Sequence, residues 1–433
     1  MKLNSLKPIA TMAFLPIAFT ACHKGMDSTQ PTTTHTISIE NVLESRPLVE
    51  SGTFKHDGAA PVVMPGESVS FQFSAGKGQS VTFATMYGWS NDLFFAPANP
   101  GITLFDTNGN PVEGDVSSSI KLWDNGTRIN QIPGSAVQHP GVAVSSSQNV
   151  MEVNGTDAQG NTYAAASSLM KVTLKYNGDS KFTLTINNTS GNTTNPTPFS
   201  PGVWAVSYNV GGSLLSPNPI YKSGNPTANG LTNLAEMGDN SLIGQYIASQ
   251  TGIFTPLSPV LVVVYKGIDN PIYTAGQIDA GHGLKNLAQT GDASGIAAYL
   301  KTVSGVKNVY VLPAATSTVL LPMVNGQSGS MVSQQLDIEK GDKIAIATMW
   351  GLSNDWFFAS KTVIDGNTPG DYSTSIGLFD DGTAVSQLPG AGYAQAALGG
   401  SPIVESQNIT EVPSNNPFVS LPTIDKFIKV TLQ

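Results

Sequence analysis

Apolar and polar residues alternate over many short stretches of this chain, and turn residues separate the stretches. In 62–73 and 331–343, a glycine-containing turn adjoins a segment in which every second side chain is apolar, the pattern of a β-strand with one buried face. In 230–239 and 283–292, leucines recur at helical spacing and the segment ends at Gly-Asp, which predicts a short helix in each. The pattern therefore predicts a mainly β protein with a few short helices.

The same structural unit occurs twice in the chain. The segment 81–96 returns as 344–359, and both contain an alternating strand, Gly-x-Ser-Asn-Asp and an aromatic pair. Further blocks recur in the same order: 120–127 with 376–383, 131–134 with 387–390, 147–153 with 406–412, and 171–174 with 429–432. Because the blocks keep their order, chance similarity is implausible, and the sequence predicts two related domains.

A second repeat lies between these copies and indicates an unusual chain order. The segment 199–207 resembles 257–264, and each is followed by Asn-Pro-Ile-Tyr and then by a predicted helix. We call the first kind of unit a back half and the second kind a front half. Their order is back (36–190), front (197–250), front (256–303), back (306–433).

This order predicts an ordinary second domain, 256–433, and a circularly permuted first domain, 36–255. The linker composition of 187–198 suits the new connection, and permutation is tolerated where domain termini lie close together. Two incomplete modules with degenerate insertions are the alternative.

Composition and charge narrow the class of protein. The chain has 433 residues, of which 40% are hydrophobic and only 12% are charged, and it contains 44 Gly and 28 Pro. This profile is typical of a turn-rich, secreted β protein. The net charge of −9, without a basic run, argues against binding to nucleic acid and favours an attraction for cations.

The N-terminus has the features of a targeting segment. Lys2 and Lys7 precede an apolar stretch, 8–21, that is too short to span a bilayer, and Cys22 is the only cysteine. This pattern resembles a bacterial lipoprotein signal. It predicts a signal peptide at 1–21, lipidation of Cys22, a stalk at 22–35, and a location at the bacterial outer membrane, the cell surface or the periplasm. A plain secretion signal with an incidental cysteine is the alternative.

The repeated motifs resemble a known family. Leu-Ser-Pro at 257–259, the helix motif at 284–292, Ser-Asn-Asp-Trp-Phe-Phe at 353–358 and Leu-Phe-Asp-Asp-Gly-Thr at 378–383 are similar to those of the spondin N-terminal domain. Matching motifs at 90–95, 123–127 and 234–239 extend the resemblance to the other half. The resemblance implies antiparallel β-sandwiches, extracellular recognition or adhesion, and a calcium ion held by loop carboxylates.

Carried over by motif, the implied calcium ligands are Asp355 and Asp380 in the second domain, and Asp92 and Asp124 in the first. Asp381 adjoins Asp380 and is a candidate for a further oxygen. Calcium takes six to eight oxygen ligands, so backbone carbonyls and water would complete each site.

The chain departs from the family just after the Asp-x-Gly-Thr turn, where an acidic residue is usual. Ala384 stands there in one copy and Arg128 in the other. A missing carboxylate weakens a cation site, and an arginine can replace the cation by pairing with Asp92 or Asp124. The alternative is that the aspartates only cap turns.

Aromatic residues beside these loops form a possible binding edge: Trp356, Phe357, Phe94 and Trp89. Strand alternation nevertheless directs about half of such side chains into a core.

Catalysis has little support in the sequence. The five histidines are scattered outside the repeated motifs, and Glu236 is replaced by Gln289 in the other copy. We therefore expect a non-enzymatic surface lipoprotein that recognises an unidentified extracellular protein or glycan. A carbohydrate-active hydrolase that uses Asp355 and Asp380 as a carboxylate pair, and a purely structural envelope protein, are the alternatives.

Overall fold

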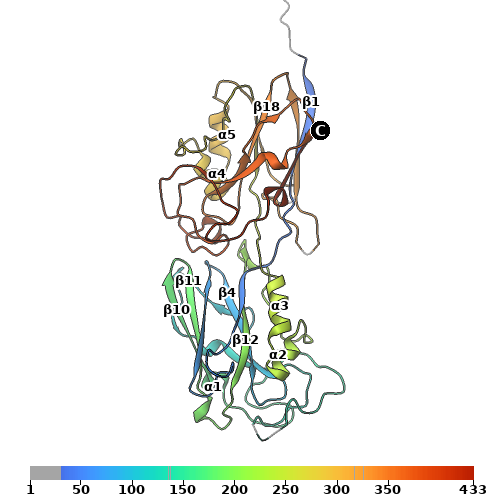
Figure 1. Ribbon diagram of the computed structural model, residues 1–433, viewed down its shortest axis with the longest axis vertical. Coiled ribbons are helices and arrows are strands. Elements are labelled where there is room, and N and C mark those ends of the chain that lie inside the picture. Colours follow the sequence, from blue (N-terminus) through green and yellow to red (C-terminus); the bar gives the residue numbers. More distant parts are fainter. Residues whose placement is uncertain (1–30, 135, 137, 316, 325) are drawn as a thin grey trace, which may run out of the picture.

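The computed structural model describes residues 31–134, 136, 138–315, 317–324 and 326–433. Two β domains lie one above the other along the long axis of the molecule (Figure 1). The predicted fold class, mainly antiparallel β with a few short helices, is confirmed. The predicted signal peptide and the lipidation site Cys22 lie outside the described residues. Within these residues, no helix is both long and apolar enough to cross a membrane.

The first domain contains two antiparallel sheets with a shared core. Its larger sheet has the order β2-β12-β4-β5-β8-β9, with β6 paired to β4, and its smaller sheet has the order β3-β11-β10-β7. Aromatic side chains such as Phe83, Phe95 and Phe182 are fully buried between the sheets. The strands are β2 (Leu48–Phe54), β3 (Ser68–Ser74), β4 (Ser80–Tyr87), β5 (Leu93–Pro97), β6 (Ile102–Thr103), β7 (Gly114–Asp115), β8 (Ile120–Asp124), β9 (Met151–Glu152), β10 (Met170–Gly178), β11 (Lys181–Asn188) and β12 (Phe199–Ser207).

The second domain repeats this arrangement. Its larger sheet has the order β16-β15-β18-β19-β22-β23, with β20 paired to β18, and its smaller sheet has the order β17-β1-β24-β21. The strands are β1 (Thr33–Asn41), β15 (Val260–Tyr265), β16 (Val306–Leu312), β17 (Met331–Ile338), β18 (Lys343–Met349), β19 (Trp356–Ser360), β20 (Ile364–Asp365), β21 (Gly370–Asp371), β22 (Ile376–Asp380), β23 (Thr410–Glu411) and β24 (Ile428–Leu432). Position by position, β1 therefore takes the place that β11 has in the first domain.

Strand β1 corrects the predicted domain boundaries. The sequence assigned 22–35 to a stalk and 36–255 to the first domain. In the structure, β1 pairs with β17 and with β24 in the second domain, where Ile39 lies opposite both Val332 and Val430. The first domain is thus inserted into the second, between β1 and β15. The physical reason is that the smaller sheet of the second domain has a place between β17 and β24, occupied by β11 in the first domain, and β1 fills it with hydrogen bonds on both sides.

Helices cover the outer face of each larger sheet. In the first domain, β12 pairs with both β2 and β4, so the front half 197–250 packs against the preceding back half. Helices α2 (Leu231–Met237) and α3 (Ser241–Ser249) then bury Leu234 and Ile243 on that sheet. Helices α4 (Leu284–Thr290) and α5 (Ser294–Leu300) do the same in the second domain. The short helix α1 (Ala166–Leu169) precedes β10.

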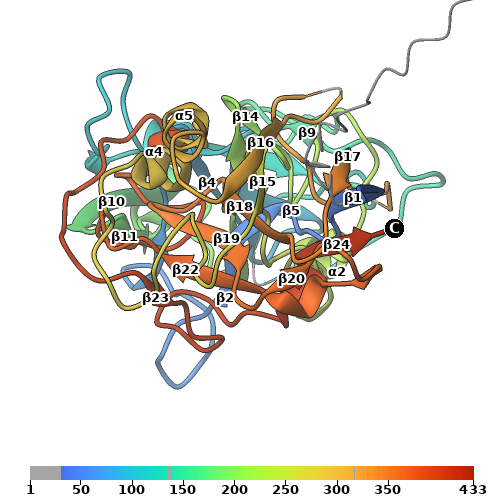
Figure 2. The same cartoon turned by 90° about the horizontal axis from the view of Figure 1, so that it is seen from above.

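The two domains meet end to end. Viewed down the long axis, they overlie each other (Figure 2). Gln79 of the first domain donates a hydrogen bond to the carbonyl of Gly390 (3.0 Å), and the Tyr393 amide donates to the hydroxyl of Ser180 (2.8 Å). Leu352 of the second domain belongs to the buried core cluster of the first. The loop end of the second domain is therefore covered by the first domain, whereas no other domain among the described residues covers the equivalent end of the first domain.

Candidate functional site

The candidate site of the second domain lies where β19 begins and β22 ends. Trp356 lies opposite Asp380 across these strands, so Asp355 and Asp381 are brought together just beyond them. The Asp381 amide donates to the backbone carbonyl of Asp355 (3.2 Å). The hydroxyl of Thr383 lies 3.1 Å from Oδ2 of Asp355 and 3.0 Å from Oδ2 of Asp381. One hydroxyl thus connects the two carboxylates.

Both of these carboxylates are buried and only partly satisfied. Oδ2 of Asp355 accepts the backbone amides of Thr383 (2.7 Å) and Ala384 (2.8 Å). Oδ1 of Asp355 and Oδ1 of Asp381 are buried and have no hydrogen-bond partner among the described residues. Both side chains are fully buried. Because buried polar atoms are almost always paired, two unpaired oxygens on neighbouring carboxylates indicate a site for a missing partner.

The electrostatics of Asp355 and Asp381 also indicate that the two carboxylates need a partner. Burial raises the pKa of Asp355 to about 7, and the negative charge of Asp380 adds to the rise. Burial also raises the pKa of Asp381 to about 7, with a contribution from Asp279 in the loop before α4. Ionised carboxylates that are desolvated and close together destabilise each other unless a cation or proton lies between them.

Asp380 has a different environment from its neighbour. Its Oδ1 accepts the amide of Gly382 (2.8 Å), and its Oδ2 accepts the indole N–H of Trp356 (3.0 Å) and the hydroxyl of Ser386 (2.9 Å). Both oxygens are therefore occupied, which fits the turn-capping alternative better than a metal ligand. The pair that presents unpaired oxygens is Asp355 with Asp381.

The first domain has the same framework with different charges. Oδ2 of Asp92 accepts the amides of Thr127 (2.7 Å) and Arg128 (2.8 Å), and its Oδ1 is buried without a partner among the described residues. Burial and the charge of Asp124 raise the pKa of Asp92 to about 6. The place of Asp381 is taken by a neutral amide, Asn125.

Asp124 resembles Asp380 in its partners. It accepts the amide of Gly126 (2.7 Å) and the side-chain amide of Asn130 (2.6 Å). It therefore caps the turn that follows β8.

An internal ion pair further distinguishes the first domain. Arg128 donates to the carboxylate of Glu236 at the end of α2, with an N–O distance of 2.6 Å. The counterparts in the second domain are Ala384 and Gln289, so both charges are absent there. The amide of Gln289 instead donates to the hydroxyl of Thr383 (3.0 Å). The arginine thus places a fixed positive charge beside the first site, and the second site has none at that position.

These donor sets decide where calcium fits. In the second domain, the unpaired oxygens of Asp355 and Asp381 are hard anionic ligands of the kind that calcium prefers. In the first domain, Oδ1 of Asp92 and Oδ1 of Asn125 are also buried without a partner among the described residues. A neutral amide replaces one carboxylate there, however, and the guanidinium of Arg128 competes with a cation, so this donor set fits calcium less well. No group of three or more Asp, Glu, His or Cys side chains with metal-binding geometry occurs in the described part of the chain. Backbone oxygens and water would have to supply the remaining ligands.

The contribution of the Arg128–Glu236 ion pair to the stability of the first domain can be tested by substitution. We expect Arg128→Ala to lower the free energy of unfolding of the first domain by about 2–3 kcal/mol, because Glu236 is left buried and unpaired. The double variant Arg128→Ala/Glu236→Gln reproduces the combination of the second domain and should recover most of the loss. Urea unfolding measures both. Equal losses in the single and double variants would show that the arginine acts through packing alone.

The predicted aromatic binding edge is wrong for three of its four residues. Trp356, Phe357 and Phe94 are 2%, 0% and 0% exposed and pack in the cores. Successive strand residues point to opposite faces, and in these central strands both faces are covered, one by the second sheet and one by helices. Trp89 is only partly buried and has a φ of 56° at the turn after β4.

The sequence prediction did not assign Asp279 or Gln289 to the site, although both residues border it. A comparison of the two copies could have found Gln289, because it changes together with the position after the Asp-x-Gly-Thr turn.

Neither a protein-family model nor a curated protein sequence matches this chain.

Proposed function

We propose that the chain is a non-enzymatic extracytoplasmic recognition protein, anchored by an N-terminal lipid, whose second domain binds calcium at Asp355 and Asp381. The observation that carries the proposal is the pair of unpaired buried oxygens, Oδ1 of Asp355 and Oδ1 of Asp381. The motif resemblance to the spondin N-terminal domain supports the same cation and the same recognition role.

The arrangement of the domains suits presentation at a surface. Strand β1 begins at the end of the second domain that lies away from the first domain (Figure 1). A lipid on Cys22 would therefore hold the second domain near the membrane and direct the first domain outward. The loop end of the first domain exposes Ile132 (59%) and Val142 (66%), which supports this end as the proposed surface for an extracellular protein or glycan.

The burial of the carboxylates argues against the hydrolase alternative. A glycoside hydrolase needs two carboxyl groups that reach the scissile bond from an open cleft. Asp355 is fully buried, and both oxygens of Asp380 are held by neighbouring groups.

Calcium titration tests the proposal. With saturating calcium at about 100 times its dissociation constant, we expect the second domain to gain about 2.7 kcal/mol, seen as a rise of several degrees in its melting temperature. Asp381→Asn, which installs the residue found in the first domain, should abolish the rise. The matched control Asp92→Asn should leave it intact. A calcium response that survives Asp381→Asn, or is absent from the wild type, would contradict the proposed site.

A further inference from the structure

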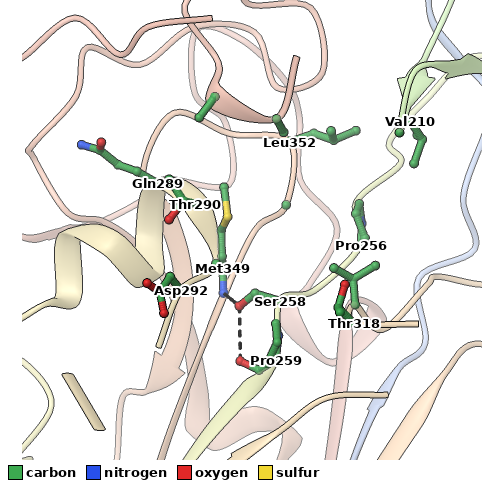
Figure 3. A pocket seen from close by; sticks show the side chains of 16 residues that line it. Val210, Pro256, Ser258, Pro259, Gln289, Thr290, Asp292, Thr318, Met349 and Leu352 are labelled. Atoms are coloured by element: carbon green, nitrogen blue, oxygen red, sulfur yellow. Dashed lines mark hydrogen bonds between the residues drawn. The ribbon is translucent and has the colours of Figure 1, made fainter. Parts of the chain in front are cut away.

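A pocket of about 550 Å³ lies between the two domains (Figure 3). Ser258, Pro259 and Met349 of the second domain form one side of it. The first domain contributes Val210 and Gly211, from the turn between β13 (Asn209–Val210) and β14 (Ser213–Leu214). A volume in this range is typical of sites for drug-sized molecules, and such sites often lie between domains.

Most of the uncharged polar side chains in the wall, those of Ser258, Gln289 and Thr290, are already bonded within the protein. The hydroxyl of Ser258 accepts the amide of Met349 (2.9 Å), and the hydroxyl of Thr290 donates to the carbonyl of Asn286 (2.8 Å). The amide of Gln289 points away from Met349 (Figure 3) and bonds the hydroxyl of Thr383 instead. A ligand would therefore meet mainly apolar surface, and the body of the ligand should be apolar.

The remaining wall residues support this conclusion. Apolar residues line the pocket from both domains, and one of them lies in the 3-10 helix η4 (Ala396–Leu398): Val210, Pro256, Val319, Met349, Leu352 and Ala396.

One charged side chain at the edge of the pocket determines which head group of a ligand is favoured. Of the described residues that line the pocket, Asp292 is the one that ionises. Hydrogen bonds from Ser294 hold the pKa of Asp292 below its usual value, so its carboxylate is charged at neutral pH. A cationic head beside Asp292 is favoured and an anionic head is disfavoured, in keeping with the net charge of −9.

The repeat shows that docking of the domains creates this pocket. The first domain has the corresponding residues Ser200, Met86, Gly238 and Asp239, and Gly238 approaches Ser200 as Gly291 approaches Ser258. No other domain covers this end of the first domain among the described residues, and Met237 there is 62% exposed. Asp239 is therefore a matched carboxylate that lacks the enclosed pocket.

We propose that the interdomain pocket binds a small cationic amphiphile, with an apolar body of about eight to twelve carbon atoms and an ammonium group beside Asp292. This site shares Gln289 with the border of the proposed calcium site but uses none of the carboxylates of that site, and the proposal does not depend on calcium. Its ligand bridges the second domain and the β13–β14 turn of the first.

Calorimetric titration in EDTA, with octylammonium, octanol, octanoate and hexylammonium as probes, tests the proposal. We expect octylammonium to bind more tightly than octanol and octanoate to bind weakest. Each methylene removed should weaken binding about fourfold. Asp292→Asn should remove the preference of about threefold for the cation over the alcohol, whereas the matched Asp239→Asn should not change it.

Two variants that fill the pocket from different walls complete the test. Val319→Trp and Ala396→Phe should each weaken binding of octylammonium at least tenfold, and an unchanged melting temperature shows that the variant has folded. The proposal is overturned if no probe binds saturably, if octanoate binds as tightly as octylammonium, or if a folded filling variant binds as the wild type does.

Discussion

Ile39→Ala is expected to lower the free energy of unfolding of the second domain by about 2–5 kcal/mol, although residue 39 precedes the whole first domain in the sequence. Ile39 is fully buried in β1, between β17 and β24, and contacts the core of the second domain. Its loss removes apolar contacts and leaves a cavity. Native-state hydrogen exchange should show faster exchange of the amides of β17 and β24, with the smaller sheet of the first domain changed least.

The equivalent residue of the first domain provides the control. Ile186 of β11 lies opposite Val69 and is also fully buried, so Ile186→Ala should destabilise the first domain by a similar amount. Ile39→Ala should therefore reduce the protection of amides in the second domain, and Ile186→Ala should reduce the protection of amides in the first. If Ile39→Ala instead affected the amides of β3 and β10 first, the N-terminal strand would not belong to the second domain in solution.

The strand β1 also shows where the sequence argument reached its limit. The repeated blocks correctly indicated a mainly β fold, because alternation and turn residues are local signals. The alternating segment that contains Ile37 and Ile39 is compatible with the edge or centre of any sheet, and no neighbouring block identified its partner. Pairing between distant segments depends on which sheet lacks a strand, and this property belongs to the complete topology.

The sequence could not assign separate roles to the candidate site residues for a similar reason. The motif identified Asp355, Asp380 and Asp381, but neighbouring residues at a strand end face opposite sides. Only the packing of Trp356 and Gln289 on the two sides shows that Asp380 caps a turn and that Asp381 keeps an unpaired oxygen. The predicted aromatic binding edge was wrong for a related reason: a central strand that lies between a sheet and helices buries its aromatic residues on both faces.

The calcium-free second domain is expected to lose stability as the pH rises from 5 to 8. The folded-state pKa values of Asp355 and Asp381 are raised to about 7 by burial, from an ordinary value of 3.8. A carboxyl with a raised folded pKa contributes its stability below the unfolded pKa, and this contribution disappears as the pH rises through the folded pKa. We expect a loss of about 2–4 kcal/mol for the pair, measured by urea unfolding in EDTA.

Two comparisons isolate this effect from other titrations. Hydrogen bonds and ion pairs with Lys266 and Lys307 hold the pKa of Glu339 to about 2, so its contribution is already complete above pH 5. Asp381→Asn removes one of the two buried charges and should reduce the pH dependence by about half. Saturating calcium should abolish it in the wild type, because the cation stabilises the ionised pair. If the calcium-free protein instead became more stable between pH 5 and pH 8, the two carboxylates would be ionised in the folded state without a cation, and the electrostatic basis of the site would be lost.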